Sequence, residues 1–281
     1  MATPLESFYQ PLAEAAGLRH GLFDSAALFT LALARWVPVF TVAPFLGSRS
    51  APAPVRMGFA IVMALFLLPW MSSQAPAPLN LDNLAWWVLL LRELALGLLL
   101  GFVSGLVFWG GEAGGRFIDS VRGTTVANTL LPQTRVQSSL LGGFYFQLLI
   151  VLFMLVGGHR WFLAGMFDSY RLLPPFSEAA LGNIVGGLIN ATADVLVIGV
   201  KMIAPALAVV MMLDLVLGVA NRMAPQLDVF FVSLSLKSAL GALAIGLSIY
   251  FIAAIANDRF VQQQHTLDEL VERLATPAEA P

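Results

Sequence analysis

Long apolar stretches separated by short polar connections run through most of the sequence. They cover residues 26–46, 57–71, 84–109, 140–156, 184–219 and 229–256. A helix that crosses a bilayer needs about 20 mostly apolar residues, so the first, third and last stretches are long enough for one crossing, whereas the second and fourth are short. Proline and polar clusters mark the connections. The pattern predicts several membrane-spanning segments.

The scarcity of charged residues supports the same prediction. Charged residues make up 11% of the 281 residues and hydrophobic residues 58%, whereas about a quarter of the residues in a soluble domain are charged. So few charges cannot cover the surface of a soluble globule of this size, and we expect membrane lipid to surround much of the chain. The formal net charge of −2 and the lack of a basic patch argue against a nucleic-acid partner.

Helices are the expected spanning elements. The sequence lacks the alternating strands of about ten residues that an outer-membrane barrel requires, and a helix satisfies its own backbone hydrogen bonds in lipid. Residues 184–219 are too many for one simple crossing and contain Pro205, which predicts two helical pieces or one kinked helix. We therefore predict an all-α polytopic membrane protein, one domain over residues 1–281, with an N-terminal segment at 1–20 and a polar tail at 257–281.

Three glycines in the third apolar stretch stand four residues apart. Gly97, Gly101 and Gly105 therefore lie on one face of the expected helix. Without side chains on that face, another helix can approach closely, as in the small-residue contacts of membrane proteins. This glycine seam predicts tight packing, either within the chain or against another subunit.

A run of alternating charges follows the third stretch. On a helix, Glu112, Arg116, Asp119 and Arg122 lie three or four residues apart and form a ladder along one side. We call these four residues the charged seam. One interpretation is a solvated interfacial helix. The other is a seam that docks on another subunit or lines a water-filled path, because charges at membrane depth tend to face protein or water.

Charges inside the apolar stretches leave a second class of function open. Asp194 and Lys201 lie two helical turns apart on one face, where they could form an ion relay or a buried structural pair. Arg35, Arg92 and Glu93 present the same choice. Discontinuous helices with charges near the bilayer midplane are features of transporters, so a small-solute or ion transporter is the alternative function.

Residue patterns typical of enzymes are missing from the sequence. There is no cysteine, no His-Glu-x-x-His metal motif and no Gly-x-Ser-x-Gly nucleophile motif. We therefore predict no catalytic residue, no metal site and no cofactor.

Two blocks of sequence resemble a known family. They are Glu-Ala-Gly-Gly-Arg-Phe-Ile-Asp-Ser-Val-Arg-Gly at 112–123 and Asn-Arg-Met-Ala-Pro-Gln-Leu-Asp-Val-Phe-Phe-Val-Ser-Leu-Ser-Leu-Lys at 221–237. Together with Gly-Gly-His at 157–159 and Asp-Ser-Tyr-Arg-Leu-Leu-Pro at 168–174, they resemble the SctT family of type III secretion export-apparatus proteins, also called YscT or HrcT. The flagellar protein FliR belongs to the same superfamily, and the two blocks are more similar to SctT.

The resemblance implies a non-enzymatic, structural and gating subunit of an export gate in the bacterial inner membrane. Its implied partners are SctR-like, SctS-like and SctU-like subunits, and its implied cargo is unfolded exported protein. Family members form kinked helical hairpins in a helical complex around a channel, which would accommodate the short and charged apolar stretches. In the second block, we expect Arg222, Pro225 and Lys237 to contribute to subunit packing.

The resemblance also implies a role for residues 124–139, which follow the charged seam and which we call the gate segment. They occupy the place of a loop that helps to plug the closed channel in the flagellar relative. Here the segment carries Leu130, Leu131 and Pro132, where the relative is aromatic before its proline. A hydrophobic constriction can close a channel by excluding water, so we expect Leu130 and Leu131 to act as a plug.

Overall fold

The computed structural model describes five long stretches of the chain. They are residues 21–46, 51–76, 83–122, 139–176 and 184–223, with positions 11, 79, 233, 235–237, 239, 246, 249, 252, 260 and 271 besides. Within 184–223, side chains are described at positions 192, 193 and 197 and from 199 onward. Most of the predicted last stretch at 229–256 and of the tail at 257–281 lies outside these residues.

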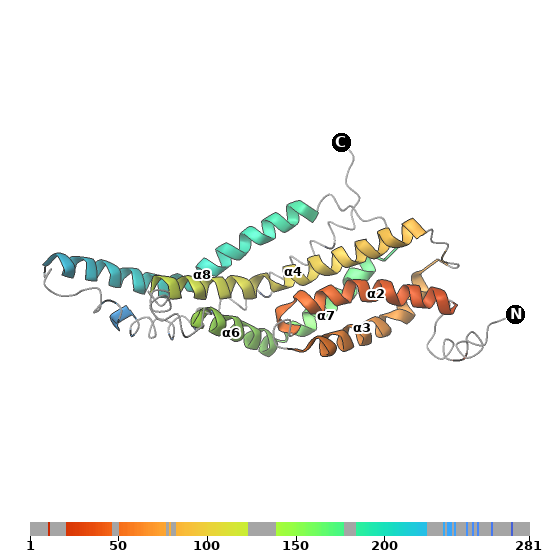
Figure 1. The fold of residues 1–281 in the computed structure, drawn as a ribbon, viewed down its shortest axis with the longest axis horizontal. Helices are drawn as coiled ribbons and strands as arrows, with labels where there is room; N and C mark the ends of the chain where they lie inside the picture. The colour runs from red at the N-terminus through yellow and green to blue at the C-terminus, as the bar shows by residue number, and fades with distance from the viewer. Residues whose placement is uncertain are drawn as a thin grey trace, which may run out of the picture. The chain divides into compact units, whose positions relative to one another are not determined.

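The regular elements of the described stretches are helices (Figure 1). In chain order they are α2 (Leu22–Val42), the short 3-10 helix η1 (Pro44–Leu46), α3 (Ala53–Gln74), α4 (Asn83–Val121), α6 (Leu140–Val156), α7 (Gly158–Leu172) and α8 (Ile184–Met223). The described stretches contain no strand. The predicted all-α fold is confirmed.

Several of these helices are long and apolar enough to cross a membrane. Among the described residues they are Leu22–Val42, Ala53–Gln74, Leu84–Val121 and Gly199–Met223. Leu140–Val156 and Gly158–Leu172 meet at an angle of 76° and together have the length and composition of a fifth, broken span. The chain is therefore a multi-pass membrane protein.

Most helices differ in extent from the apolar stretches that predict them, and only α6 matches its stretch. α4 continues through the charged seam to Val121 as one helix of 39 residues. α8 has 40 residues and contains Pro205, and it changes direction in its middle, so the kinked-helix alternative applies (Figure 1). Proline removes a backbone donor and crowds the preceding turn, which explains a bend there.

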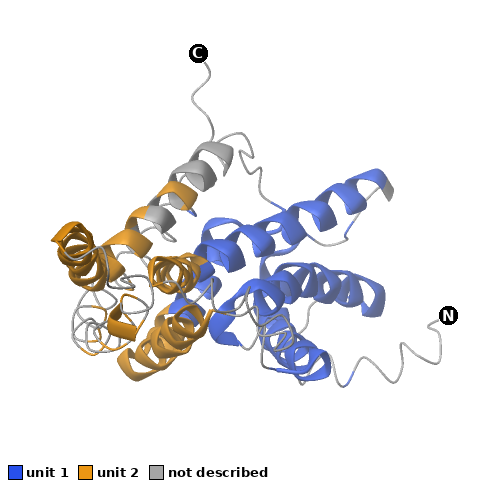
Figure 2. Cartoon of the chain, turned by 60° about the vertical axis from the view of Figure 1, so that its left-hand side comes forward, with its two compact units in different colours: residues 1–105, 162–188, 266–281 blue, residues 106–161, 189–265 orange. Residues whose placement is uncertain are grey.

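The chain divides into two compact units (Figure 2). Unit 1 comprises residues 1–105, 162–188 and 266–281. In it α2 packs beside α3, and rings of α2 and η1 contact α7. Trp36 lies 6.0 Å from Phe167 between ring centroids, and Phe45 lies 4.9 Å from Phe162.

Unit 2 comprises residues 106–161 and 189–265. Three of its phenylalanines pack ring against ring. Phe108 of α4 and Phe153 of α6 lie 5.4 Å apart, and Phe260 lies 5.7 Å and 5.1 Å from them. The three side chains are buried and form the aromatic core of this unit.

Helix α7 follows α6 through a glycine turn. Gly157 has a φ of 82°, a left-handed conformation that side chains disfavour. Its N–H contacts the carbonyl of Met154 at 3.1 Å and so ends α6. The chain can therefore turn sharply into α7, a helix that the apolar stretches do not predict.

Candidate functional site

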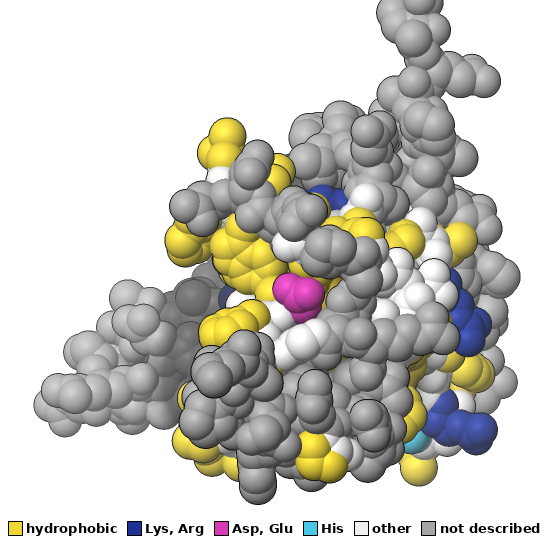
Figure 3. Space-filling model, turned by 90° about the vertical axis from the view of Figure 1, so that its right-hand side faces the viewer, with side chains coloured by type: hydrophobic (Ala, Val, Ile, Leu, Met, Phe, Trp, Pro, Cys, Tyr) yellow, Lys and Arg dark blue, Asp and Glu magenta, His cyan; other side chains and the backbone are white. Residues whose placement is uncertain are grey.

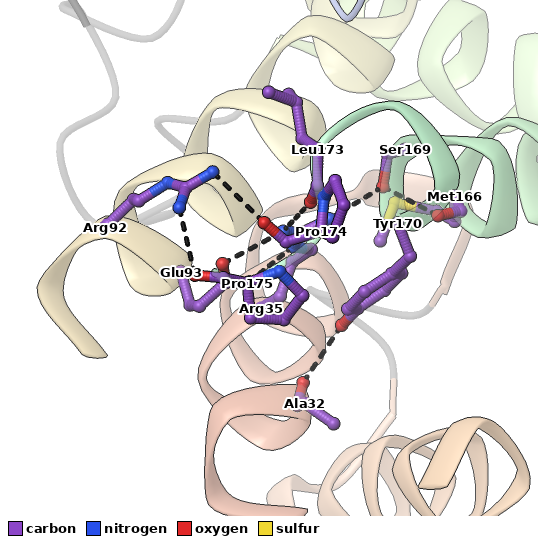
Figure 4. A network of polar contacts seen from close by, with 10 residues as sticks. All are labelled: Ala32, Arg35, Arg92, Glu93, Met166, Ser169, Tyr170, Leu173, Pro174 and Pro175. Atoms are coloured by element: carbon purple, nitrogen blue, oxygen red, sulfur yellow. Dashed lines mark hydrogen bonds and ion pairs between the residues drawn. The ribbon is translucent and has the colours of Figure 1, made fainter. Parts of the chain in front are cut away.

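A buried cluster of polar side chains surrounds Arg35 of α2 in unit 1 (Figure 4). Its Nε donates to Oε2 of Glu93 at 2.6 Å and its Nη2 donates to Oε1 at 3.0 Å, so guanidinium and carboxylate form a two-point ion pair. Both side chains are 0% exposed. Nη1 donates to Ser169 at 3.3 Å, and the guanidinium carbon lies 3.9 Å from the centre of the Tyr170 ring. The two charges are therefore a buried structural pair.

The arginines of this cluster also bind the backbone that follows α7. Arg35 donates to the carbonyl oxygen of Leu173 at 2.9 Å. Arg92 donates to the carbonyl oxygens of Pro174 at 3.3 Å and Pro175 at 3.0 Å. Residues 173–175 follow the end of α7 and belong to no helix, so their carbonyl oxygens need a donor from elsewhere. We call Arg35, Arg92 and Glu93 the arginine cluster; it fixes the path of the chain as it leaves α7.

The glycine seam brings α4 close to α2. A Cβ on Gly97 would overlap the carbonyl oxygen of Arg35, and a Cβ on Gly101 would lie 3.1 Å from the Cα of Val39. Glu93 lies one turn before Gly97, on the same face of α4. The missing side chain at Gly97 therefore lets α2 approach until Arg35 reaches Glu93. Gly105 is buried on the same helix.

The charged seam divides into two pairs on the last turns of α4. Arg116 Nη2 donates to Glu112 Oε1 at 2.6 Å, and the side chain of Arg116 is 61% exposed while that of Glu112 is 9% exposed. Arg122 Nη1 lies 4.0 Å from Asp119 Oδ1. Neither interpretation of the seam is tested by this geometry, but its acidic members are buried and Arg116 points outward.

Asp119 forms further hydrogen bonds with the start of α6 in unit 2. Its Oδ2 accepts from Ser139 Oγ at 2.6 Å and from the backbone N–H of Leu141 at 2.9 Å. Ser139 Oγ in turn accepts from the N–H of Gly142 at 2.8 Å. Asp119 thus joins α4 to α6, a contact that the helical spacing of the seam does not predict.

Two further pairs of glycines in α4 pack against other helices of unit 2. A Cβ on Gly114 would lie 2.9 Å from the carbonyl oxygen of Gly199 in α8, and a Cβ on Gly199 would lie 2.7 Å from that of Gly110. On another side of α4, a Cβ on Gly115 would lie 2.6 Å from the backbone of Leu141 in α6. The repeated Gly-Gly at 110–111 and 114–115, spaced by one turn, is the sequence signal for this contact.

The remaining predicted residues lie on α8, at isolated described positions or outside the described residues. Arg222 is exposed in the last turn of α8, and Lys237 Nζ lies 2.5 Å from Oδ1 of Asp214 in α8. Lys201 is exposed on α8. Outside the described residues or side chains lie Asp194, Pro225, Leu130, Leu131 and Pro132.

Comparison with known proteins places the chain among bacterial export proteins. The model of the bacterial export proteins, family 1, matches residues 26–263. The flagellar biosynthetic protein FliR of Bacillus subtilis is 30% identical over 241 residues, which cover 83% of this chain and 91% of the relative. Yop proteins translocation protein T of Yersinia pestis is also 30% identical to this chain. Sequence identity therefore does not separate the SctT branch from FliR, and the preference for SctT stays a prediction.

Two further relatives carry names that do not refer to flagella. Yop proteins translocation protein T of Yersinia pestis is 30% identical over 220 residues, covering 77% of this chain and 84% of the relative. Surface presentation of antigens protein SpaR of Salmonella typhimurium is 30% identical over 226 residues, covering 80% and 82%. The resemblance to the superfamily of SctT and FliR is confirmed. Because the family model spans most of the sequence, the chain belongs to family 1 of the bacterial export proteins.

Proposed function

We propose that the chain is a non-enzymatic subunit of a protein export gate in the bacterial inner membrane. The observation that carries the proposal is the family match over residues 26–263, together with relatives named for flagellar biosynthesis and for Yop translocation. In this proposal the chain assembles with SctR-like, SctS-like and SctU-like subunits, and unfolded proteins pass through the complex.

Exposed apolar side chains support assembly in a membrane. On α3 these side chains are Val55, Met57, Phe59, Ile61, Val62, Leu65 and Phe66. Exposed apolar side chains are also visible on the face shown in Figure 3. A water-soluble monomer rarely exposes large contiguous apolar patches, whereas lipid or neighbouring subunits cover such surfaces. The buried charges of Arg35 and Glu93, by contrast, are paired within the chain.

Co-purification tests the proposed assembly. The tagged chain, expressed with the neighbouring secretion genes and extracted in detergent, should elute as a stable hetero-oligomer with SctR-like and SctS-like subunits. Fractionation should place that complex in the inner membrane. A chain that purifies alone and moves an ion or small solute into liposomes would contradict the gate and favour the transporter.

We further propose that Leu130 and Leu131 of the gate segment seal the resting channel. Serine at both positions would hold water in a hydrophobic constriction, so the closed complex should leak ions or a small dye. The measurement compares leakage between cells that contain equal amounts of wild-type and variant complex. Unchanged leakage at normal assembly would leave the segment as a simple connection.

A further inference from the structure

The outer face of α7 carries two charges that the arginine cluster does not include. Arg171 Nη1 lies 3.1 Å from Asp168 Oδ1, and the two side chains are 71% and 51% exposed. Ala164 is exposed one turn earlier on the same face. The opposite face is buried, with Phe162 and Tyr170 among its side chains. α7 is therefore amphipathic, and protein already covers its apolar face. We call Asp168 and Arg171 the exposed pair.

Contacts with α2 and η1 fix the level of the exposed pair within unit 1. Phe45, just beyond the end of α2, lies 4.9 Å from Phe162 between ring centroids. Eight residues further along α7, the Tyr170 hydroxyl donates to the carbonyl oxygen of Ala32 at 3.3 Å (Figure 4). The two helices therefore run in opposite directions. Because Tyr170 stands between the two members of the exposed pair in sequence, the pair lies level with Ala32, the middle residue of α2 (Leu22–Val42).

The middle of α2 is also the middle of a candidate membrane span. The 21 residues of this helix extend for about 31 Å, close to the thickness of the hydrocarbon layer of a bilayer, about 30 Å. A charged side chain at that depth is costly in lipid and tends to face protein or water. A long side chain near a helix end can reach the headgroups, but the short side chain of Asp168 cannot do so from mid-depth. Lipid is therefore an unfavourable surrounding for the exposed pair.

The exposed face of α3 is apolar at the same level. Phe59 of α3 lies 6.1 Å from Phe40 of α2, and Phe66 of α3 lies 5.9 Å from Phe167 of α7, between ring centroids. Val62 stands between these two phenylalanines of α3 and is 56% exposed. Unit 1 therefore has an apolar surface and a charged surface at one depth. Lipid suits the first, whereas water or protein suits the second.

The charges of the exposed pair are neutralised within α7. Ion pairs three residues apart are common on the water-facing sides of helices, and covering the pair with another protein would require both charges to be desolvated. We propose that the face of α7 formed by Ala164, Asp168 and Arg171 lines a water-filled path at the depth of the middle of α2. The inference goes beyond the proposed function and does not depend on it, because it rests on α2 crossing the membrane.

Thiol labelling compares the two surfaces. The chain has no native cysteine, so Asp168→Cys and Val62→Cys each place one thiol in it, at matched depth. The chain, with the subunits that co-purify with it, is reconstituted in nanodiscs, where a small charged methanethiosulfonate can reach both sides of the bilayer. The thiolate is the reactive form, and apolar surroundings disfavour it. Asp168→Cys should react at least roughly tenfold faster than Val62→Cys, since a change of one pKa unit alters the thiolate fraction by that factor.

A second position on α7 provides the matched check. Ala164→Cys retains both charges of the exposed pair and should react as fast as Asp168→Cys; it decides alone if Asp168→Cys does not fold. Equally fast labelling of Val62→Cys would show that water surrounds unit 1 on both surfaces and would overturn the inference. Slow labelling of both α7 positions would also overturn it. Faster labelling of α7 after the co-purified subunits are removed would then identify another subunit, rather than water, as the cover.

Discussion

At the scale of single residues, Arg35 shows how a charge is accommodated inside a membrane protein. Its guanidinium donates to two carboxylate oxygens, a hydroxyl and a backbone carbonyl. Desolvation of two charges costs several kcal/mol per ion and is offset only when geometry is good and the remaining donors are satisfied. Arg35 meets that condition because Glu93 of α4 and Ser169 and Leu173 at the end of α7 converge on it.

Removing one partner of this pair should destabilise the folded subunit more than removing both. Glu93→Gln leaves Arg35 buried without a counter-charge, and breaking a buried pair in this way costs about 3–5 kcal/mol. We expect little folded subunit in membranes, measured by detergent-extracted monomer on fluorescence-detected size exclusion. Asp168→Asn, in the exposed pair with Arg171, should leave the yield unchanged.

The double variant Arg35→Met, Glu93→Met tests the effect of removing both charges. It replaces two charges by apolar side chains and should recover part of the yield that Glu93→Gln loses. If the double variant yields less folded protein than Glu93→Gln, the pair does not act as one unit.

At the scale of helices, glycines set how closely α4 meets its neighbours. Gly97 and Gly101 face α2 in unit 1, while Gly114 faces α8 and Gly115 faces α6 in unit 2. Dispersion between closely packed backbones substitutes for the hydrophobic effect, which is weak between helices in lipid. Helix α4 therefore makes close glycine contacts with three other helices, α2, α6 and α8.

Two adjacent glycines of α6 give a controlled test of this packing. A Cβ on Gly142 would lie 2.8 Å from Arg116 Cγ and 2.9 Å from a backbone oxygen, whereas a Cβ on Gly143 meets nothing within 4 Å. Gly142→Ala should therefore destabilise the fold by about 1–3 kcal/mol through overpacking. Gly143→Ala should stabilise it by about 0.4–1 kcal/mol, because alanine loses less backbone entropy in a helix. Thermal unfolding in detergent measures both, and equal shifts would argue against the close approach.

Gly101→Leu should prevent formation of the complete complex. The side chain would collide with the backbone of α2 near Val39, where even a Cβ has only 3.1 Å. The measurement is the abundance of hetero-oligomer after purification. Gly58→Leu, at a position on α3 where a Cβ meets nothing within 4 Å, is the control. Normal hetero-oligomer from Gly101→Leu would show that the seam tolerates a large side chain.

At the scale of the whole molecule, a charge on the outer face of α3 should impede insertion. Val62 lies in the middle of this candidate span and is 56% exposed. An arginine at the centre of a spanning helix costs about 2.5–3.5 kcal/mol during insertion, so Val62→Arg should lower the membrane-integrated fraction after an alkaline wash. Gln74→Arg at the end of α3 should not, because its charge can reach the headgroups. Equal integration would mean that protein or water, rather than lipid, covers Val62.

The sequence predicts the helices better than it predicts their contacts. The apolar stretches indicate α2, α3, α4, α6 and α8, although those at 57–71 and 140–156 are short for a complete crossing. It does not indicate α7, because Arg160, Asp168 and Arg171 interrupt the apolar pattern while the opposite face of that helix is buried.

Contacts between distant residues are the part that local sequence does not encode. Arg35 and Glu93 are 58 residues apart in the chain, and no spacing rule pairs them. The charged seam suggested ion pairs along α4, yet Asp119 binds Ser139 and Leu141 across a helix boundary. The Gly-Gly pairs at 110–111 and 114–115 overlap the charged seam, and local sequence does not separate their packing from the contacts of the charges. Helical periodicity identifies a face, whereas the partner of that face depends on the fold.

The length of α4 has a consequence for where its charges lie. At a rise of about 1.5 Å per residue, the 39 residues of this helix extend for about 58 Å, roughly twice the 30 Å of a bilayer's hydrocarbon layer. Residues 94–111 carry no charge and extend for about 27 Å. That interval separates Glu93 from Glu112 by close to one hydrocarbon thickness. The uncharged interval of α4 is therefore long enough for one crossing of the hydrocarbon layer, and a glutamate stands directly before and directly after it.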